Sequence, residues 1–307
     1  MPTAPGRRPG RGRNSSLPGW PMPGQPGQEY PDAAHVAEYL TAYEHRYNLP
    51  VGRPVRVQAV HRDGQRLRIE TSLGAWHAKA VVSATGTWWR SFLPAIPGRA
   101  VFTGRQLHTT AYRSPEQFTG QKVVVVGGGN SGAQIAADLA LHGGIEVTWV
   151  TRRPPRLLPD HIDGRALSDA ATARRRALEA GLPDTGGVAS LGDIVAVPPV
   201  RAARDAGLLK AQPMATRLTP GGVAWADGTT AEADAVIWCT GFRPALSHLA
   251  PLGLRGHLAT DGTRAVGEPR LHLLGYGDWT GPASATLIGV GRPARDATAD
   301  IARLLSS

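Results

Sequence analysis

Residues 123–132, VVVVGGGNSG, give the strongest indication of how this chain folds. Its continuous apolar run is typical of a parallel strand that is covered on both faces. The glycine pattern GxGxxG follows at once and opens an alanine-rich segment, residues 131–142, that is predicted to be helical. A second apolar strand is expected at residues 145–150. Strand, helix and strand within about 30 residues predict a βαβ unit.

The glycines of this motif each have a physical task at a phosphate-binding turn. Gly127 permits the tight turn, Gly129 leaves room for a diphosphate, and Gly132 lets the helix pack close to the strand. The helix N-terminus adds free N–H groups and a partial positive charge. Because a strand precedes the loop and a helix follows it, the sequence favours a dinucleotide site over a purely structural turn.

The residues after the second strand indicate which nucleotide binds. An NAD site usually places an acidic residue roughly 20 residues beyond the first glycine, where it holds the ribose 2′-hydroxyl. Here Arg152 and Arg153 occupy that region. A guanidinium can bind a 2′-phosphate through two hydrogen bonds, so the sequence predicts NADP(H) over NAD(H). Arginines that merely face solvent are the alternative.

The rest of the chain also alternates between strand and helix patterns, which predicts an α/β fold. Pro31 and Asp32 start a helix that reaches Tyr47, and Asp63-Gly64 is a hairpin turn signal between alternating segments. Further strands are expected at residues 78–84, 223–228, 233–239 and 271–275, and helices at residues 165–180 and 283–305, the last one broken or kinked at Pro293.

Composition excludes several classes of protein. The single cysteine, Cys239, cannot form an internal disulfide or a CxxC redox pair, and we expect a small buried residue there. The sequence has no apolar run of membrane-spanning length, and we expect a cytoplasmic protein. The net charge of +10 includes a basic N-terminal segment, in which a solvated arm is favoured over contact with nucleic acid. No metal site is expected, because the polar loop at residues 159–163 fits no known ligand spacing.

Several motifs resemble those of one enzyme family. The segment FTGRQLHTTAY, residues 102–112, matches FxGxxxHxxx(Y/F), the identifying motif of class B flavin monooxygenases, and stands just before the glycine loop. Ala84-Thr85-Gly86 and Cys239-Thr240-Gly241 resemble the linker motifs of that family, and Gly277-Asp278 resembles its FAD-binding Gly-Asp motif. From about residue 16 onward the chain is similar to small bacterial members found with arsenic-resistance operons.

The resemblance implies two dinucleotide-binding domains, with NADP(H) and FAD as cofactors. Hydride would pass from NADPH to FAD, and O2 activated as a C4a-peroxyflavin would oxygenate a small molecule. Asp278 would accept a hydrogen bond from the flavin ribityl chain, and a helix starting near Ala283 would direct its N-terminus at the flavin. Nucleic acid and membrane partners are not expected, and a homodimer is left open. The residues implied are His108 and Asn130 as catalytic residues, and Gly127, Gly129, Ser131, Gly132, Arg152, Arg153, Gly241, Gly277 and Asp278 as cofactor-binding residues.

One part of the family pattern is not found. The strand–GxGxxG–helix that holds the FAD diphosphate is expected near the start of the chain, but the glycines of residues 1–30 lie among prolines, which lack the N–H groups of a phosphate cradle. We therefore expect a truncated or frame-disturbed version of a longer protein, with weak or absent FAD binding. The alternatives are a pyridine-nucleotide reductase of the same fold and a non-catalytic NADP-binding remnant.

The predicted organisation follows from this gap. A Rossmann-like NADP domain, residues 116–235, would be inserted in an incomplete FAD domain, residues 31–115 and 236–307, after an irregular arm, residues 1–30.

Overall fold

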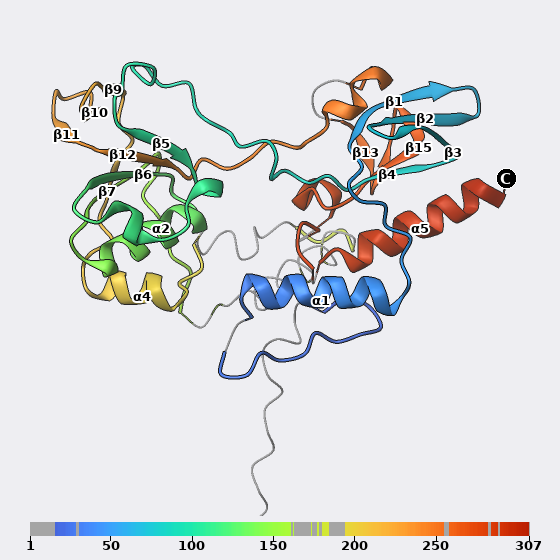
Figure 1. Cartoon of the computed structure of the whole chain (residues 1–307), viewed down its shortest axis with the longest axis horizontal. Helices are drawn as coiled ribbons and strands as arrows, with labels where there is room; N and C mark the ends of the chain where they lie inside the picture. The colour runs from blue at the N-terminus through green and yellow to red at the C-terminus, as the bar shows by residue number, and fades with distance from the viewer. Residues whose placement is uncertain are drawn as a thin grey trace, which may run out of the picture. The chain divides into compact units, whose positions relative to one another are not determined.

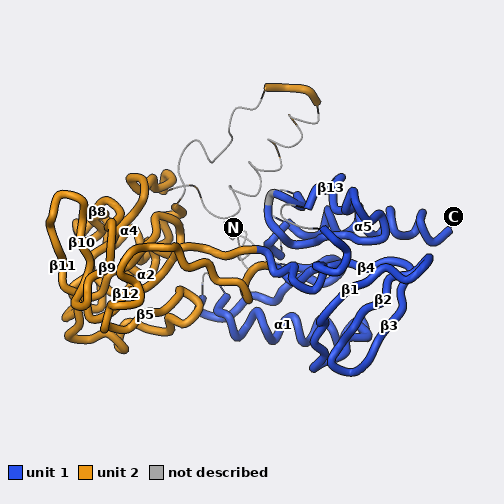
Figure 2. Tube along the Cα trace, turned by 90° about the horizontal axis from the view of Figure 1, so that it is seen from above, with its two compact units in different colours: residues 1–86, 244–307 blue, residues 87–243 orange. Residues whose placement is uncertain are grey.

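The computed structural model divides the chain into two compact units, coloured separately in Figure 2. Unit 1 comprises Met1–Gly86 and Pro244–Ser307, and unit 2 comprises Thr87–Arg243. Unit 2 is therefore one continuous segment that lies, in the sequence, between the two segments of unit 1. The structure describes residues 16–28, 31–160, 162, 173, 177, 180–183, 194–254, 258–281, 284–287 and 289–306.

A parallel sheet forms the centre of unit 2. Within the described ranges it has five strands in the order β5-β12-β6-β7-β8, and every neighbouring pair is parallel. This is the expected α/β arrangement, and Figure 1 shows it with its helices. The strands are β5 (Arg105–His108), β6 (Lys122–Val126), β7 (Glu146–Thr151), β8 (Ala211–Pro213) and β12 (Ala235–Trp238).

The central strand β6 is buried on both faces, as its apolar run predicts. Val123 and Val125 pack in one hydrophobic cluster with helices α2 (Asn130–His142) and α4 (Pro198–Asp205). Val124 and Val126 pack on the opposite face. A small antiparallel sheet covers that face and consists of β9 (Arg217–Thr219), β10 (Gly222–Ala224) and β11 (Thr230–Glu232). Short 3-10 helices η2 (Thr109–Ala111) and η3 (Pro115–Phe118) connect β5 to β6.

Unit 1 contains two sheets in its described part. The antiparallel sheet β1-β2-β3 includes the expected hairpin turn, with Asp63 paired to Arg66. In the second sheet, β13-β14-β15-β4, only β15 and β4 are parallel. The bounds are β1 (Val57–Asp63), β2 (Arg66–Thr71), β3 (Gly74–Ala78), β4 (Val81–Ser83), β13 (Thr260–Asp261), β14 (Arg264–Ala265), β15 (Glu268–Leu273), and the 3-10 helices η5 (Ser247–Leu252) and η6 (Gly277–Thr280).

Helix α1 (Ala33–Arg46) begins where the sequence predicts, because the Asp32 carboxylate accepts a hydrogen bond from the backbone N–H of His35 at 2.8 Å. The irregular residues 16–28 are bonded to this helix. The Tyr39 hydroxyl accepts from Leu17 N and donates to Trp20 O, both at 2.7 Å. This part of the expected arm is thus irregular but attached.

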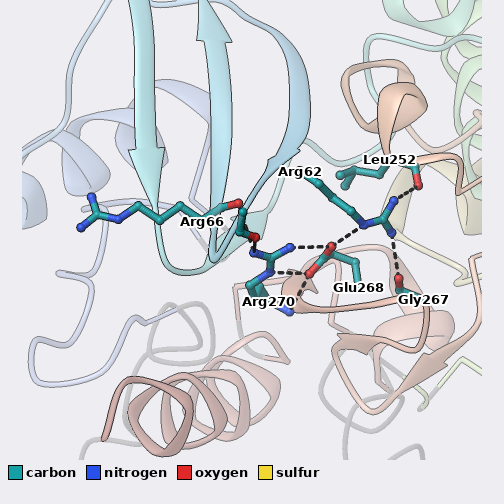
Figure 3. A network of polar contacts seen from close by, with 7 residues as sticks. Arg62, Arg66, Leu252, Gly267, Glu268 and Arg270 are labelled. Carbon is teal, nitrogen blue, oxygen red and sulfur yellow. Dashed lines mark hydrogen bonds and ion pairs between the residues drawn. The ribbon is translucent and has the colours of Figure 1, made fainter. Parts of the chain in front are cut away.

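A buried carboxylate ties three elements of unit 1 together (Figure 3). Glu268 is only 3% exposed and accepts hydrogen bonds from Arg62 Nε at 2.8 Å and from Arg270 Nε at 2.7 Å. Arg62 also donates to Leu252 O in η5, and Arg270 donates to Gly64 O in the β1–β2 turn. Because each guanidinium also binds backbone carbonyls, the network fixes the hairpin against β15.

Three sequence predictions need correction or comment. The strand expected at residues 78–84 is split: β3 ends at Ala78, and β4 starts at Val81 in a different sheet. The C-terminal helix α5 (Gly291–Ser306) begins eight residues later than expected. Pro293 lies in its first turn, where a missing N–H costs no intrahelical bond, and so does not break it. The helix expected at residues 165–180 falls largely outside the described residues.

The structure also divides the chain at other positions than those expected. Strand β5 pairs with β12 in parallel, with Arg105 beside Ala235 and His108 beside Trp238, and residues 87–115 and 236–243 lie in unit 2. The described helices include none that is both long enough and apolar enough to span a bilayer.

The ends of each piece of chain are bonded within their own unit. In unit 2, Phe92 N donates to Gly241 O at 2.9 Å and Arg243 N donates to Arg90 O at 2.8 Å. In unit 1, Ala245 N donates to Gly86 O at 2.9 Å. The first and last residues of unit 2 therefore lie side by side.

Candidate functional site

The glycine loop lies at the carboxyl end of β6, between this strand and α2. Gly127 has φ +138°, and a Cβ there would lie 2.2 Å from Cys239 O. A Cβ on Gly132 would lie 2.1 Å from Gly127 O, so only glycine permits this approach of helix and loop. At Gly129 a Cβ would meet no atom within 4 Å, which leaves open space above the loop.

This space is bordered by free hydrogen-bond donors. The backbone N–H groups of Gly128, Gly129, Asn130, Ser131 and Gly132 have no acceptor in the part of the chain that the structure describes. The first intrahelical bond runs from Ala133 N to Gly129 O. A run of unsatisfied amides at a helix N-terminus, with the positive end of the helix dipole behind it, is suited to an anionic group.

A cavity of about 580 Å³ opens beside the loop, within unit 2. That volume falls in the range of small-molecule and cofactor pockets. Its walls come from the carboxyl ends of β6, β7 and β12, the edge at which parallel sheets bind ligands. The lining residues are Phe92, Pro94, Ala95, Val126, Gly127, Gly128, Val150, Arg152, Arg153, Pro154, Met214, Cys239 and Thr240.

Arg152 and Arg153 line this cavity directly after β7. Neither guanidinium has an ion-pair or hydrogen-bond partner among the described residues. Two cations without a protein anion, beside a row of free amides, match a ligand with two separate anionic groups. A nucleotide with a diphosphate and a ribose phosphate has this chemistry, so the residues present fit NADPH.

The side chains of Asn130 and His108, which the sequence predicts to be catalytic, each form a hydrogen bond to the backbone. Asn130 Oδ1 accepts a hydrogen bond from Val195 N at 2.7 Å, which holds the segment around Val195 against the start of α2. His108 ends β5, and its Nε2 lies 3.0 Å from Gly241 O, which can only accept, so Nε2 carries the proton. Burial lowers the pKa of His108, and the ring is neutral at pH 7. Both residues lie outside the cavity lining.

Cys239 forms part of the cavity wall, directly after β12. Burial raises the pKa of its thiol to about 12, so a thiolate is scarce at neutral pH. The neighbouring Thr240 hydroxyl donates to Phe92 O, and the Arg243 guanidinium lies over the Phe92 ring at 4.6 Å. The linker motif at residues 239–241 thus supports one wall of the cavity.

The predicted FAD residues lie in unit 1. Gly277 has φ +72° and starts η6 after β15, and its carbonyl accepts from Ser284 Oγ at 2.7 Å. Asp278 belongs to η6, but its side chain lies outside the described part. Ala283 also lies outside it, and the helix expected to start there begins only at Gly291, with turns before it. That expectation was wrong.

Unit 1 fits FAD only in part. Among its described residues, no strand passes through a GxGxxG loop into an α-helix, the arrangement that would hold the FAD diphosphate on free amides. The Gly-Asp junction after β15 is the matching feature.

Sequence reasoning missed several residues at the cavity of unit 2. Phe92 and Met214 reach it from segments without a motif, so no local signal marks them. Trp149 lies beneath the glycine loop and reads in the sequence as one apolar residue of a strand. A tryptophan in a predicted buried strand is a usable signal, since the N–H of a buried indole usually finds a hydrogen-bond acceptor nearby.

Known proteins of similar sequence and structure identify the family independently of these contacts. The family model described as pyridine nucleotide-disulphide oxidoreductase matches residues 18–163. An uncharacterized CzcO-like oxidoreductase of Geobacillus kaustophilus is 27% identical over 94% of this chain and 82% of its own length. The solved flavin-containing monooxygenase from Stenotrophomonas maltophilia is 46% identical, with a TM-score of 0.83 over 96% of this chain and 83% of that one.

A variant of a flavin monooxygenase from the same organism gives 48% identity and a TM-score of 0.83, over 94% of this chain and 82% of that one. These similarities confirm the expected α/β fold with two dinucleotide-binding domains and the resemblance to class B enzymes. The chain belongs to the family of flavin-containing monooxygenases.

Proposed function

We propose that this chain is an NADPH-dependent flavin monooxygenase whose nicotinamide nucleotide binds at the cavity of unit 2. The observation that carries the proposal is a run of amides at residues 128–132 beside a cavity that Gly128, Arg152 and Arg153 line, with no acceptor for these amides and no partner for either guanidinium among the described residues. The amides would hold the diphosphate, and Arg152 and Arg153 would hold the 2′-phosphate. Ser131 lies in the first turn of α2 and belongs to the same cradle.

FAD is the second cofactor of the family, and when bound it would supply the redox chemistry by which NADPH and O2 oxygenate a small molecule. We assign the FAD side to unit 1, with Gly277 and Asp278 as the residues that would hold it. Because the described part of unit 1 lacks a phosphate cradle, we propose that this 307-residue chain retains FAD weakly. A flavin absorbance band at one FAD per chain after gel filtration would contradict this.

The two predicted catalytic residues take a different role in this proposal. His108 is neutral and donates to Gly241 O, so it holds the linker residue Gly241 beside the cavity wall. Asn130 holds the start of α2 to the segment at Val195. Both are therefore positioning residues, and hydride transfer needs no acid–base pair from the protein.

Coenzyme preference tests the nucleotide site directly and requires no bound FAD. Arg152→Gln and Arg153→Gln should each weaken NADPH binding about tenfold, because each removes charged hydrogen bonds to the 2′-phosphate. NADH affinity should stay the same. Arg217→Gln on β9 is the control, since it makes the same charge change outside the cavity lining. Isothermal titration calorimetry of the purified chain measures all three.

Two results would refute parts of the proposal. Equal losses for NADPH and NADH would remove the 2′-phosphate assignment. No binding of either nucleotide to the unmodified chain would remove the site. The partial fit to FAD is the observation that supports the alternative, a non-catalytic NADP-binding remnant. Measuring NADPH oxidation with and without added FAD distinguishes the two functions. Turnover that rises with FAD supports the monooxygenase, and NADPH binding without turnover supports the remnant.

A further inference from the structure

Trp149 holds the first carbonyl of the glycine loop from below. It lies in β7, paired with Val125 of β6, and is 3% exposed. Its indole Nε1–H donates a hydrogen bond to Gly127 O at 2.7 Å. The same nitrogen lies 3.5 Å from where a Cβ of Gly132 would be, so the indole, the loop and the start of α2 meet at one point.

This hydrogen bond fixes the direction of a neighbouring amide. The carbonyl of Gly127 and the N–H of Gly128 belong to one planar trans peptide, in which the two groups point in opposite directions. Because the carbonyl points into the interior toward Trp149, the Gly128 N–H points outward. Gly128 lines the cavity, and its N–H has no acceptor among the described residues.

We propose that Trp149 is a positioning residue for nucleotide binding, whose indole N–H orients the Gly127–Gly128 peptide so that the Gly128 amide faces the nucleotide diphosphate. The inference rests on the proposed nucleotide site and deepens it. Without the indole donor, Gly127 O has no other hydrogen-bond partner in the described structure, and the peptide loses the contact that sets its orientation.

A purely structural role for Trp149 makes a different prediction. As a core residue it packs with Ala133, Ala136 and Val125, and loss of that packing would loosen the whole nucleotide site. As a positioning residue it acts only on the diphosphate end. Adenosine 2′-monophosphate separates the two roles, because it carries the phosphate assigned to Arg152 and Arg153 but no diphosphate.

The test is Trp149→Phe, which keeps an aromatic ring in the core and removes the donor. NADPH affinity should fall about fivefold, as expected for one lost neutral hydrogen bond. Affinity for adenosine 2′-monophosphate should remain within twofold of the unmodified chain. Trp225→Phe is the matched control, because Trp225 Nε1 also donates to a backbone carbonyl at 2.7 Å, that of Pro213, and neither residue lines the cavity. Calorimetric titration of each variant, with NADPH and adenosine 2′-monophosphate in turn, gives the comparison.

Three outcomes would overturn the inference. Equal loss of both ligands in Trp149→Phe would show a structural role, and no loss of NADPH affinity would show that the indole donor is unimportant. A fivefold loss in Trp225→Phe as well would show that any indole–carbonyl bond in unit 2 has this effect. Failure of the unmodified chain to bind either ligand would instead refute the proposed nucleotide site itself.

Discussion

Replacing the buried carboxylate of unit 1 should destabilise that unit strongly. In Glu268→Gln, two guanidiniums that share one carboxylate would face a neutral amide (Figure 3). Breaking a buried ion pair from one side costs about 3–5 kcal/mol. Arg62 is 48% exposed and can be rehydrated, whereas Arg270 is 19% exposed, so we expect a loss near the lower limit, about 3 kcal/mol. For a unit of this size, that lowers Tm by roughly 6–12 °C.

The pH dependence gives the network a signature of its own. The hydrogen bonds from Arg270, followed by those from Arg62, lower the pKa of Glu268 below its usual value. A lowered folded-state pKa means that the contribution is complete above the unfolded pKa, about 4.3, and is lost as pH falls through the folded value. Since glutamine does not titrate, the difference in Tm between the two proteins should be largest at neutral pH and should shrink below about pH 4.

Thermal unfolding followed by circular dichroism at several pH values measures both effects. Arg66→Gln is the control: it lies at the same hairpin, its side chain points away from the network, and only its carbonyl accepts from Arg270 (Figure 3). It should leave Tm unchanged. A Glu268→Gln variant within about 2 °C of the unmodified chain at pH 7 would contradict the reasoning.

Three further predictions concern unit 2. Gly132→Ala should lower the free energy of unfolding by about 1–3 kcal/mol and weaken NADPH binding, because its methyl group would overlap Gly127 O. Gly129→Ala should leave Tm unchanged but weaken NADPH binding, since its methyl group would enter only the open space above the loop. Melting curves and calorimetric titration compare the two variants. Cys239 should react with iodoacetamide at pH 7.5 far more slowly than free cysteine, because burial raises the pKa of its thiol to about 12. Mass spectrometry measures the alkylation over time, and a rate like that of free cysteine would count against this prediction. Tyr112→Phe removes a 2.6 Å hydrogen bond to Asp138 and should cost about 1 kcal/mol in thermal unfolding without changing NADPH affinity.

The parts of the fold that sequence predicts well are those with local causes. A run of valines needs both faces covered, three glycines permit one kind of turn, and Asp32 caps the residue three positions later. Each of these signals acts within a few residues. The β6–α2–β7 unit and helix α1 were therefore predicted within one or two residues of their observed ends.

The features that sequence did not predict depend on partners that are distant along the chain. Glu268 is buried as an ion because Arg62 reaches it from another sheet, and no periodicity marks that pairing. Trp149 bonds to Gly127 O because Gly127 directly follows the neighbouring strand β6. His108 was assigned by a motif, but only the structure shows which atoms its two ring nitrogens contact.

The bonded ends of the two units have an evolutionary consequence. Gly86 and Ala245 pair within unit 1, and Arg90 and Arg243 pair within unit 2. A module whose entry and exit adjoin can be grafted into a single loop of a host without stretching either. Recombination could thus exchange residues 87–243 as one cassette, with both junctions at positions where the backbone is already paired.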